Sequence, residues 1–199
     1  MAERPLLNHQ EMVIQPGERE HARAFFETMG FEVADMADGQ HIAVRIDPEA
    51  GFTGDNVMYA NEATPAQQKL EVALAQAIAS DAQLADTVER YKRIRWKHPQ
   101  YVAHFGASCP THGDWKERVE RLQEANRSHP LLKGRIDIKL SEPGLPDALG
   151  PLSQAFIHTD ILACGPFALA GILFDLQWIP ELDLENLPPI AFPDMATMV

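Results

Sequence analysis

The sequence predicts an α+β fold of two paired βαβββ modules that form a curved, open sheet around a cup. Two observations predict this fold. The order strand–helix–strand–strand–strand occurs twice along the 199 residues, and a segment of helical composition joins the two occurrences. The predicted boundaries are 6–62 for the first module, 63–98 for the helical connector, 99–179 for the second module and 180–199 for a proline-rich tail.

The elements of the first module follow from hydrophobic periodicity and from the glycines and prolines between the segments. Apolar side chains recur at helical spacing from Ala22 to Met29, and Gly30 follows where a helix C-cap places glycine. Apolar and polar residues alternate in the segments on either side, which is typical of strands. The predicted elements are a strand in the second half of 6–15, a helix over 18–29 and strands over 31–36, 41–47 and 56–60.

The connector and the second module are predicted in the same way. No glycine or proline occurs from Gln67 to Trp96, so this stretch is expected to form one or two helices. The second module is then expected to contain a strand over 101–108, a helix over 114–126 and strands over 135–140, 155–162 and 172–178. His9 and His104 fall in the first predicted strand of each module.

Composition excludes several classes of function. The chain carries 17 Lys and Arg against 29 Asp and Glu, so its formal net charge is −12. Binding to phosphates needs a basic face, so nucleic acid is not expected as a partner. No apolar run approaches the roughly 18 residues of a membrane span, and the first residues lack the apolar core of a signal peptide. Only two cysteines occur, so we expect a cytoplasmic protein with no membrane contact and no disulfide framework.

The phrase His-Ala-Arg-Ala-Phe-Phe-Glu-Thr-Met-Gly-Phe-Glu-Val at 21–33 resembles a helix and strand of the vicinal oxygen chelate superfamily, which includes glyoxalases and extradiol dioxygenases. The resemblance covers most of residues 6–178. Two such modules pack there into an open, curved sheet, and a divalent metal often lies in the cup. The segments 154–162 and 171–178 are also similar to the closing hairpin of the 4-hydroxyphenylpyruvate dioxygenases.

The resemblance implies that His9, His104 and Asp175 are metal ligands. Two histidines and one carboxylate on one face of a metal leave open positions, which suits Fe(II) chemistry with dioxygen. The same residues can also hold Mn, Zn or Ni. The superfamily usually has glutamate where this chain has Asp175, and the shorter side chain leaves the position and identity of the metal open.

Three further residues are candidates for work on the substrate. Gln154 and Gln177 are amides that can orient a substrate or a ligand residue inside the cup. His158 shares the parity of Asp160 in the predicted strand and is a candidate for substrate binding or general base catalysis. The alternative to a functional role for each histidine is an ordinary hydrogen bond within the fold. The alternative for Asp175 is a position exposed to solvent, because burying an unpaired carboxylate is costly.

Three other histidines, one cysteine and the tail are expected to have simpler roles. His98, His112 and His129 adjoin proline or glycine and are expected in loops. Cys109 lies near His112, but no third member of a nucleophilic site is visible, so a structural role is expected. The tail, with Phe192 among its apolar residues, could pack plainly, close a neighbour's cup or fill a partner groove.

The function expected from these observations is that of a metal-dependent enzyme, a non-haem Fe(II) dioxygenase acting on a small aromatic or 2-oxo acid substrate. The first alternative is a metal-dependent isomerase or lyase of the glyoxalase type. Such enzymes often take a fourth ligand from the fourth strand, where Asn56 to Tyr59 include no carboxylate. The second alternative is a metal-free protein that sequesters a small molecule. A homodimer is compatible with each of these functions.

Overall fold

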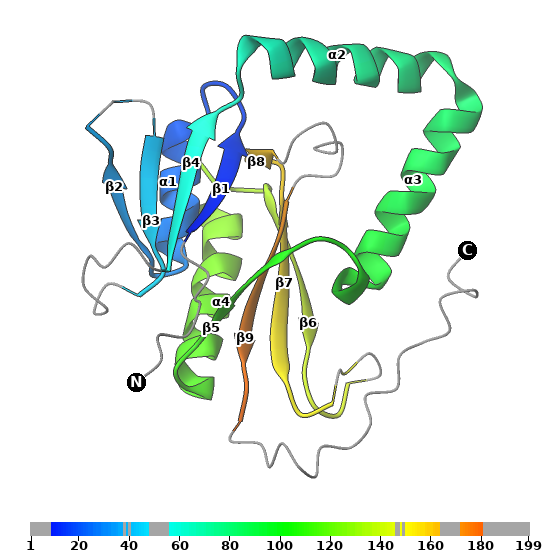
Figure 1. Ribbon diagram of the computed structural model, residues 1–199. Helices are drawn as coiled ribbons and strands as arrows, with labels where there is room; N and C mark the ends of the chain where they lie inside the picture. Colours follow the sequence, from blue (N-terminus) through cyan, green and yellow to red (C-terminus); the bar gives the residue numbers. More distant parts are fainter. Residues whose placement is uncertain are drawn as a thin grey trace, which may run out of the picture.

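A computed structural model describes residues 9–37, 39, 41–47, 56–145, 148, 150–163 and 172–180. It confirms the α+β fold with paired βαβββ modules (Figure 1). The elements are β1 (His9–Ile14), α1 (Arg19–Thr28), β2 (Glu32–Asp35), β3 (His41–Arg45), β4 (Val57–Glu62), α2 (Pro65–Ser80), α3 (Ala82–Lys97), the 3₁₀ helix η2 (Pro99–Tyr101), β5 (Phe105–Ser108), α4 (His112–Ser128), β6 (Ile136–Ser141), β7 (Ser153–Thr159), β8 (Leu162–Ala163) and β9 (Ile172–Trp178).

The two modules have the same strand topology. The first sheet has the order β2-β3-β4-β1-β8, and β1 runs parallel to β4. The second sheet has the order β5-β9-β7-β6, and β5 runs parallel to β9. In each module the first and last strands are therefore neighbours. The helix of the module connects the first strand to the antiparallel strands that follow it. The short strand β8 leaves the second module and pairs with β1 of the first.

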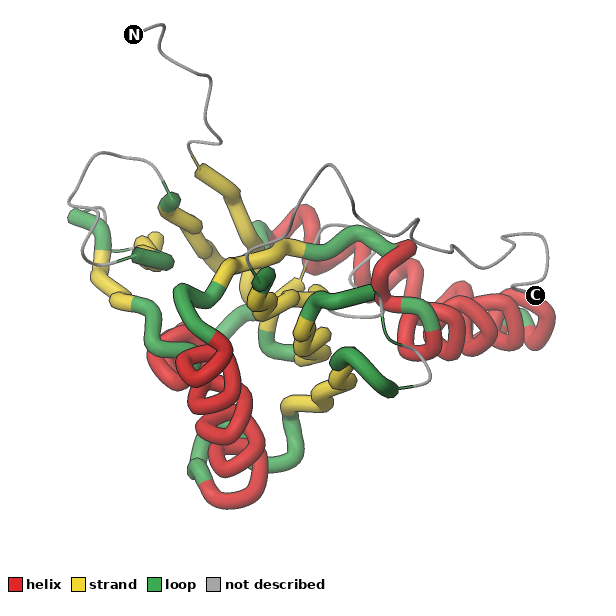
Figure 2. The backbone as a smooth tube through the Cα atoms, turned by 90° about the horizontal axis from the view of Figure 1, so that it is seen from below, coloured by secondary structure: helices red, strands yellow, loops and turns green. Residues whose placement is uncertain are grey.

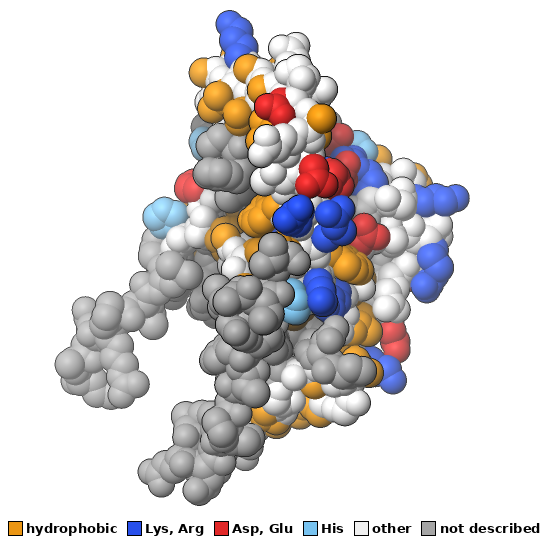
Figure 3. All heavy atoms as spheres, turned by 90° about the vertical axis from the view of Figure 1, so that its right-hand side faces the viewer, with side chains coloured by type: hydrophobic (Ala, Val, Ile, Leu, Met, Phe, Trp, Pro, Cys, Tyr) orange, Lys and Arg blue, Asp and Glu red, His pale blue; other side chains and the backbone are white. Residues whose placement is uncertain are grey.

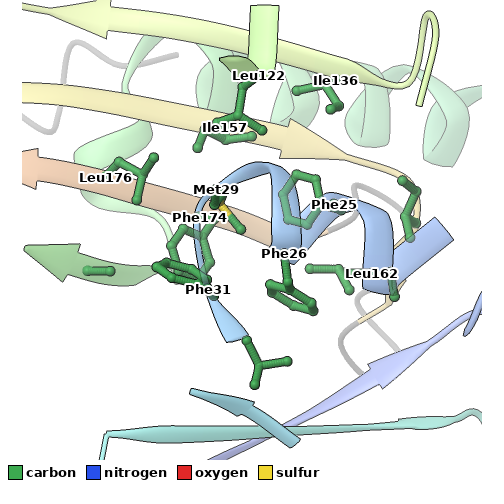
Figure 4. Close-up of a cluster of buried hydrophobic side chains, with 14 of the residues drawn as sticks. Phe25, Phe26, Met29, Phe31, Leu122, Ile136, Ile157, Leu162, Phe174 and Leu176 are labelled. Atoms are coloured by element: carbon green, nitrogen blue, oxygen red, sulfur yellow. The ribbon is translucent and has the colours of Figure 1, made fainter. Parts of the chain in front are cut away.

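The helices of both modules lie together on one side of the strands, and one hydrophobic core lies under them (Figure 2). In Figure 4, Phe25 and Phe26 of α1 lie in the same cluster as Phe174 of β9, and Leu122 of α4 lies beside Ile157 of β7. All five side chains are buried. The α1 and α4 helices thus join the two modules through this core. The opposite face of each sheet points away from these helices.

The connector forms two helices that project from the body of the molecule (Figure 1). Thr64 caps α2 through its side chain, and Pro65 occupies the first helical position. Asp81 ends α2 and caps α3, because its carboxylate accepts from the amides of Gln83 and Leu84. No side chain of α2 is buried, and Arg95 is the one buried side chain of α3.

Three of the predicted elements differ from the structure for an identifiable local reason. The strand predicted over 101–108 is β5 alone, since Pro99 starts a 3₁₀ turn, and His104 therefore precedes the strand. The strand predicted over 155–162 is divided at a turn in which the Ile161 amide donates to the Thr159 hydroxyl, so β7 and β8 lie in different sheets. The α4 helix includes His112, which was expected in a loop, because Thr111 caps it.

Among the described helices, none combines the length and the apolar character that crossing a membrane requires.

Candidate functional site

The alternation of side chains along β7 and β9 separates a core face from a polar face. Phe174 and Leu176 of β9 point to the core. The intervening residues point the other way and pair across the strands as Gln154 with Gln177, Phe156 with Asp175, and His158 with Leu173. We call this the polar face of the second sheet. Four of the six residues assigned to the site from the sequence lie there, namely Gln154, His158, Asp175 and Gln177.

Asp175 is the most unusual group on the polar face. The residue is only 2% exposed, and Gln154 Nε2 donates to Oδ2 at 2.8 Å. The other carboxylate oxygen, Oδ1, and Oε1 of Gln154 are both buried, and neither has a hydrogen-bond partner among the described residues. Burial raises the pKa of Asp175 to about 6, although the hydrogen bond from Gln154 and the charge of His104 each act to lower it. The carboxyl group can therefore both hold and release a proton near neutral pH.

His104 and Gly106 lie beside this carboxyl group. Nδ1 of His104 is 2.7 Å from the carbonyl oxygen of Val102, and its ring meets the edge of Phe156 with centroids 5.9 Å apart. Gly106 is the register partner of Asp175 on β5. A Cβ at position 106 would lie 3.5 Å from Nε2 of Gln177 and 4.0 Å from Oδ2 of Asp175. Glycine therefore leaves space directly over the two polar side chains.

His158 occupies the other end of the polar face, under the end of the connector. The tilted ring of Trp96 lies against it with centroids 4.9 Å apart, and His158 Nε2 is buried with no hydrogen-bond partner in the described part of the chain. Burial, followed by the charges of Arg95 and Lys139, lowers the pKa of His158 to about 4. The ring is therefore neutral near pH 7. It is a poor general base because so low a pKa gives little driving force for proton uptake.

Sequence reasoning missed the contribution of the connector to this face. Lys139 of β6 donates through Nζ to the carbonyl oxygen of Lys97 at 2.6 Å, which ties the end of α3 to the second sheet. Trp96, at the end of α3, covers His158. A tryptophan among basic residues at the end of an otherwise alanine-rich and polar connector was the one available signal in the sequence.

The predicted metal triad is not assembled among the described residues. His9 begins β1 in the first sheet, is exposed, and has its ring 5.8 Å from that of Tyr59. His104 and Asp175 belong to the second module. Within the part of the chain that the structure describes, no group of three or more His, Cys, Asp or Glu is placed to hold a metal ion. The described residues therefore do not fit a centre with three such ligands.

The fourth strand of the first module adds no ligand either. It extends further than predicted, to Glu62, but this residue has the parity of the core-facing Met58 and Ala60. Its carboxylate accepts from the amide of Gly17 at 3.1 Å. Glu62 therefore stabilises the turn after β1.

Cys109 and His112 do not form a nucleophilic pair. The Cys109 thiol is buried, and burial raises its pKa to about 11, so it stays protonated. His112 stacks on Trp115 with an angle of 11° between the rings and lies against Trp178. The structural role expected for Cys109 agrees with these contacts.

No family model matches the sequence, and no curated protein matches it. Solved structures with a similar arrangement include hypothetical protein SA1046 from S. aureus, with 9% identity, a TM-score of 0.42 and coverage of 90% of this chain and 95% of that one. Another is described as a "putative glyoxalase family protein" from Bacillus anthracis, with 12% identity, a TM-score of 0.43 and coverage of 89% and 98%. A third is protein PA1353 from Pseudomonas aeruginosa, with 9% identity, a TM-score of 0.41 and coverage of 87% and 98%.

Proposed function

We propose that this chain is an enzyme that binds a small molecule on the polar face of the second sheet, with Asp175 as the group that transfers a proton. The observation that carries the proposal is the pair of buried acceptors without partners, Oδ1 of Asp175 and Oε1 of Gln154. Leaving such atoms unsatisfied costs about 1–3 kcal/mol each. A ligand that donates hydrogen bonds to them would remove that cost.

The reaction that fits this group is proton abstraction or proton donation at a small substrate. A general acid or base works best when its pKa lies near the operating pH, and the pKa of Asp175 is about 6. Gln154 would hold Oδ2, which leaves Oδ1 for the substrate. This chemistry is that of the isomerase and lyase class, carried out by residues of this chain.

The substrate would be a small aromatic molecule that carries a hydroxyl, amine or amide donor. Phe156 and His104 supply ring surfaces near the carboxyl group, and Trp96 supplies another at the His158 end of the face. A 2-oxo acid is the less favoured substrate, because its carboxylate would meet the Asp175 charge whenever that group is ionised. The positive charges of Arg95 and Lys139 lie at the His158 end of the face, where an anionic group would be placed best.

A metal-dependent reaction is the second candidate, and one observation favours it. A hydrogen bond from Nδ1 to a backbone carbonyl is a common way to orient a metal-binding histidine, and His104 is held in this way against Val102. His104 is also close enough to Asp175 for its charge to influence the pKa of that carboxyl. Bound Fe(II) would supply dioxygen chemistry and another divalent ion a Lewis acid. Two of the three predicted ligands are thus near each other.

The test combines a ligand screen with metal analysis. Wild type and Asp175→Asn are screened by ligand-observed NMR against aromatic compounds with hydroxyl, amine or 2-oxo acid groups, and every hit is assayed for turnover. We expect hits with wild type and a loss of turnover of at least about 100-fold in the variant. Glu11→Gln, which removes an exposed carboxylate from the first sheet, is the matched control.

Metal content measured on anaerobically purified protein separates the two candidates. The proton-transfer proposal predicts that activity survives the removal of metals by a chelator. Stoichiometric Fe or Mn that is lost in both His104→Ala and Asp175→Asn, together with activity that requires it, would replace this proposal by the metal-dependent one. Full activity in Asp175→Asn would overturn both.

A further inference from the structure

The end of α3 presents a basic and aromatic surface to solvent. Residues 90–97 contain five Lys and Arg and no Asp or Glu, although the whole chain has a net charge of −12. Arg93, Trp96 and Lys97 are spaced three and four residues apart, so they share one face of the helix. Trp96 is 44% exposed on that face although its ring also contacts His158. We call Arg93, Trp96 and Lys97 the α3 patch.

The charges of the α3 patch are not neutralised within the described residues. On the same helix, Arg90 pairs with Asp86 at 3.3 Å and Lys92 pairs with Glu89 at 2.8 Å. No described acidic group forms an ion pair with the patch residues Arg93 and Lys97. The space-filling view from the α3 side shows Lys and Arg side chains gathered around apolar atoms on this face (Figure 3). The patch is therefore suited to a segment that is acidic and apolar together.

The chain contains one such segment, residues 181–199, which follow the described part that ends at Pro180. This segment has four acidic residues and no Lys or Arg. Its first acids, Glu181, Asp183 and Glu185, alternate with Leu182 and Leu184. In an extended chain the acids would lie on one side and the leucines on the other.

The prolines and the length of residues 181–199 also favour this segment as the one that binds the α3 patch. Pro188 and Pro189 form a run of the kind that adopts the polyproline conformation, and aromatic side chains such as Trp96 are the usual surface for such runs. Nineteen residues remain after Pro180, and an extended chain of that length reaches about 60 Å. The segment is therefore long enough to span a small domain.

We propose that residues 181–199 of this chain bind to the α3 patch of the same molecule. Charge attraction to Arg93 and Lys97 and burial of the Trp96 ring are the main contributions. The contact would also stabilise α3, whose side chains are otherwise almost all unburied, because helices of this length are marginal in water unless a face is packed.

Hydrogen exchange of the α3 amides in the full chain tests the proposal. A tail variant carries Glu181→Gln, Asp183→Asn, Glu185→Gln and Asp194→Asn, which keeps its length and removes its charge. We expect amides of 90–97 to exchange at least about tenfold faster in this variant than in wild type. A patch variant, Arg93→Gln with Lys97→Gln, should give the same loss of protection.

The matched control is Glu117→Gln with Glu120→Gln, which removes exposed acids from α4 and should leave α3 exchange unchanged. Wild-type protection should also fall at 1 M salt and be independent of protein concentration. Equal exchange in wild type and tail variant would overturn the proposal. Protection that disappears on dilution would overturn it too, since the patch would then be covered by a second copy.

Discussion

The faces of the two sheets that point away from the shared core have the same strand topology but differ in the burial of their polar groups. On the first sheet His9 and Glu11 are exposed, and Asn61 donates to Glu11 at 3.5 Å, so its polar atoms reach water or each other. On the second sheet Asp175 and Gln154 are buried, each with an oxygen that has no partner. Duplicated topology therefore does not imply duplicated function. The candidate site belongs to the second module, and the end of the connector covers part of it.

The largest expected effect is on stability, from Asp175→Asn. The pKa of Asp175 is about 6 in the folded chain against 3.8 as the ordinary value, so the folded state binds the proton more tightly. Wild type should lose stability as the pH rises from about 4 to about 6. The variant has no such loss, so at pH 7 it should be more stable by about 3 kcal/mol at most.

Urea unfolding at pH 7 and pH 4 measures this effect. Glu11→Gln on the first sheet is the comparison, and its exposed position predicts a change within about 0.5 kcal/mol at both pH values. A destabilised Asp175→Asn at pH 7 would mean that the carboxylate is a structural partner, and the contrast between the two faces would be lost.

The second effect concerns His158, whose contribution to stability changes with pH in the opposite direction to that of Asp175. Its pKa is about 4 in the folded chain, below the ordinary 6.5, so the unfolded chain binds the proton more tightly. Stability due to this group is lost as the pH falls from about 6.5 to about 4, by about 2 kcal/mol once the screening by solvent at this partly exposed ring is allowed for. His158→Gln should abolish that loss in urea unfolding between pH 7 and pH 4. An unchanged pH dependence would show that the ring is open to solvent.

A smaller effect is expected at Gly30, where the first module meets the second. Gly30 has φ +82°, and an added Cβ would lie 2.7 Å from Nη1 of Arg118, a residue of α4 that donates to the Met29 carbonyl. Gly30→Ala should destabilise the chain by about 1–2 kcal/mol, because alanine is strained at positive φ. Thermal unfolding measures the loss. The variant should leave ligand binding at the second sheet unchanged, and an altered affinity would argue that both modules form the site.

The smallest effect on stability is expected at Gly106. A Cβ there would make ordinary contacts with Gln177 and Asp175, so Gly106→Ala should change the free energy of unfolding by less than about 1 kcal/mol. The methyl group would nevertheless occupy the space over the two polar side chains. We expect weaker binding of any ligand found in the screen, measured by NMR titration. Unchanged affinity would place the ligand elsewhere.

The alternation of apolar and polar residues correctly predicted which segments form strands and which side chains of a strand share a face. The strand over 172–178 was correctly bounded, and its alternation separates Asp175 from Phe174 as the register confirms. The sequence could not predict how far apart residues of the two sheets lie in the folded chain. The family resemblance implies that His9 and His104 share one site, but the tertiary arrangement decides whether they meet. The contact of Trp96 with His158 is likewise non-local.

The titration of the Asp175 carboxyl group tests the central claim most directly. Carbon-13 NMR of aspartate-labelled protein follows each side-chain carboxyl from pH 3 to pH 8, and the signal missing from Asp175→Asn assigns the residue. A pKa of about 6 is the predicted result, shifted further by a ligand that donates to Oδ1. A value near the ordinary 3.8 would contradict the claim, since Asp175 would then be an ionised, solvated side chain with no proton to transfer.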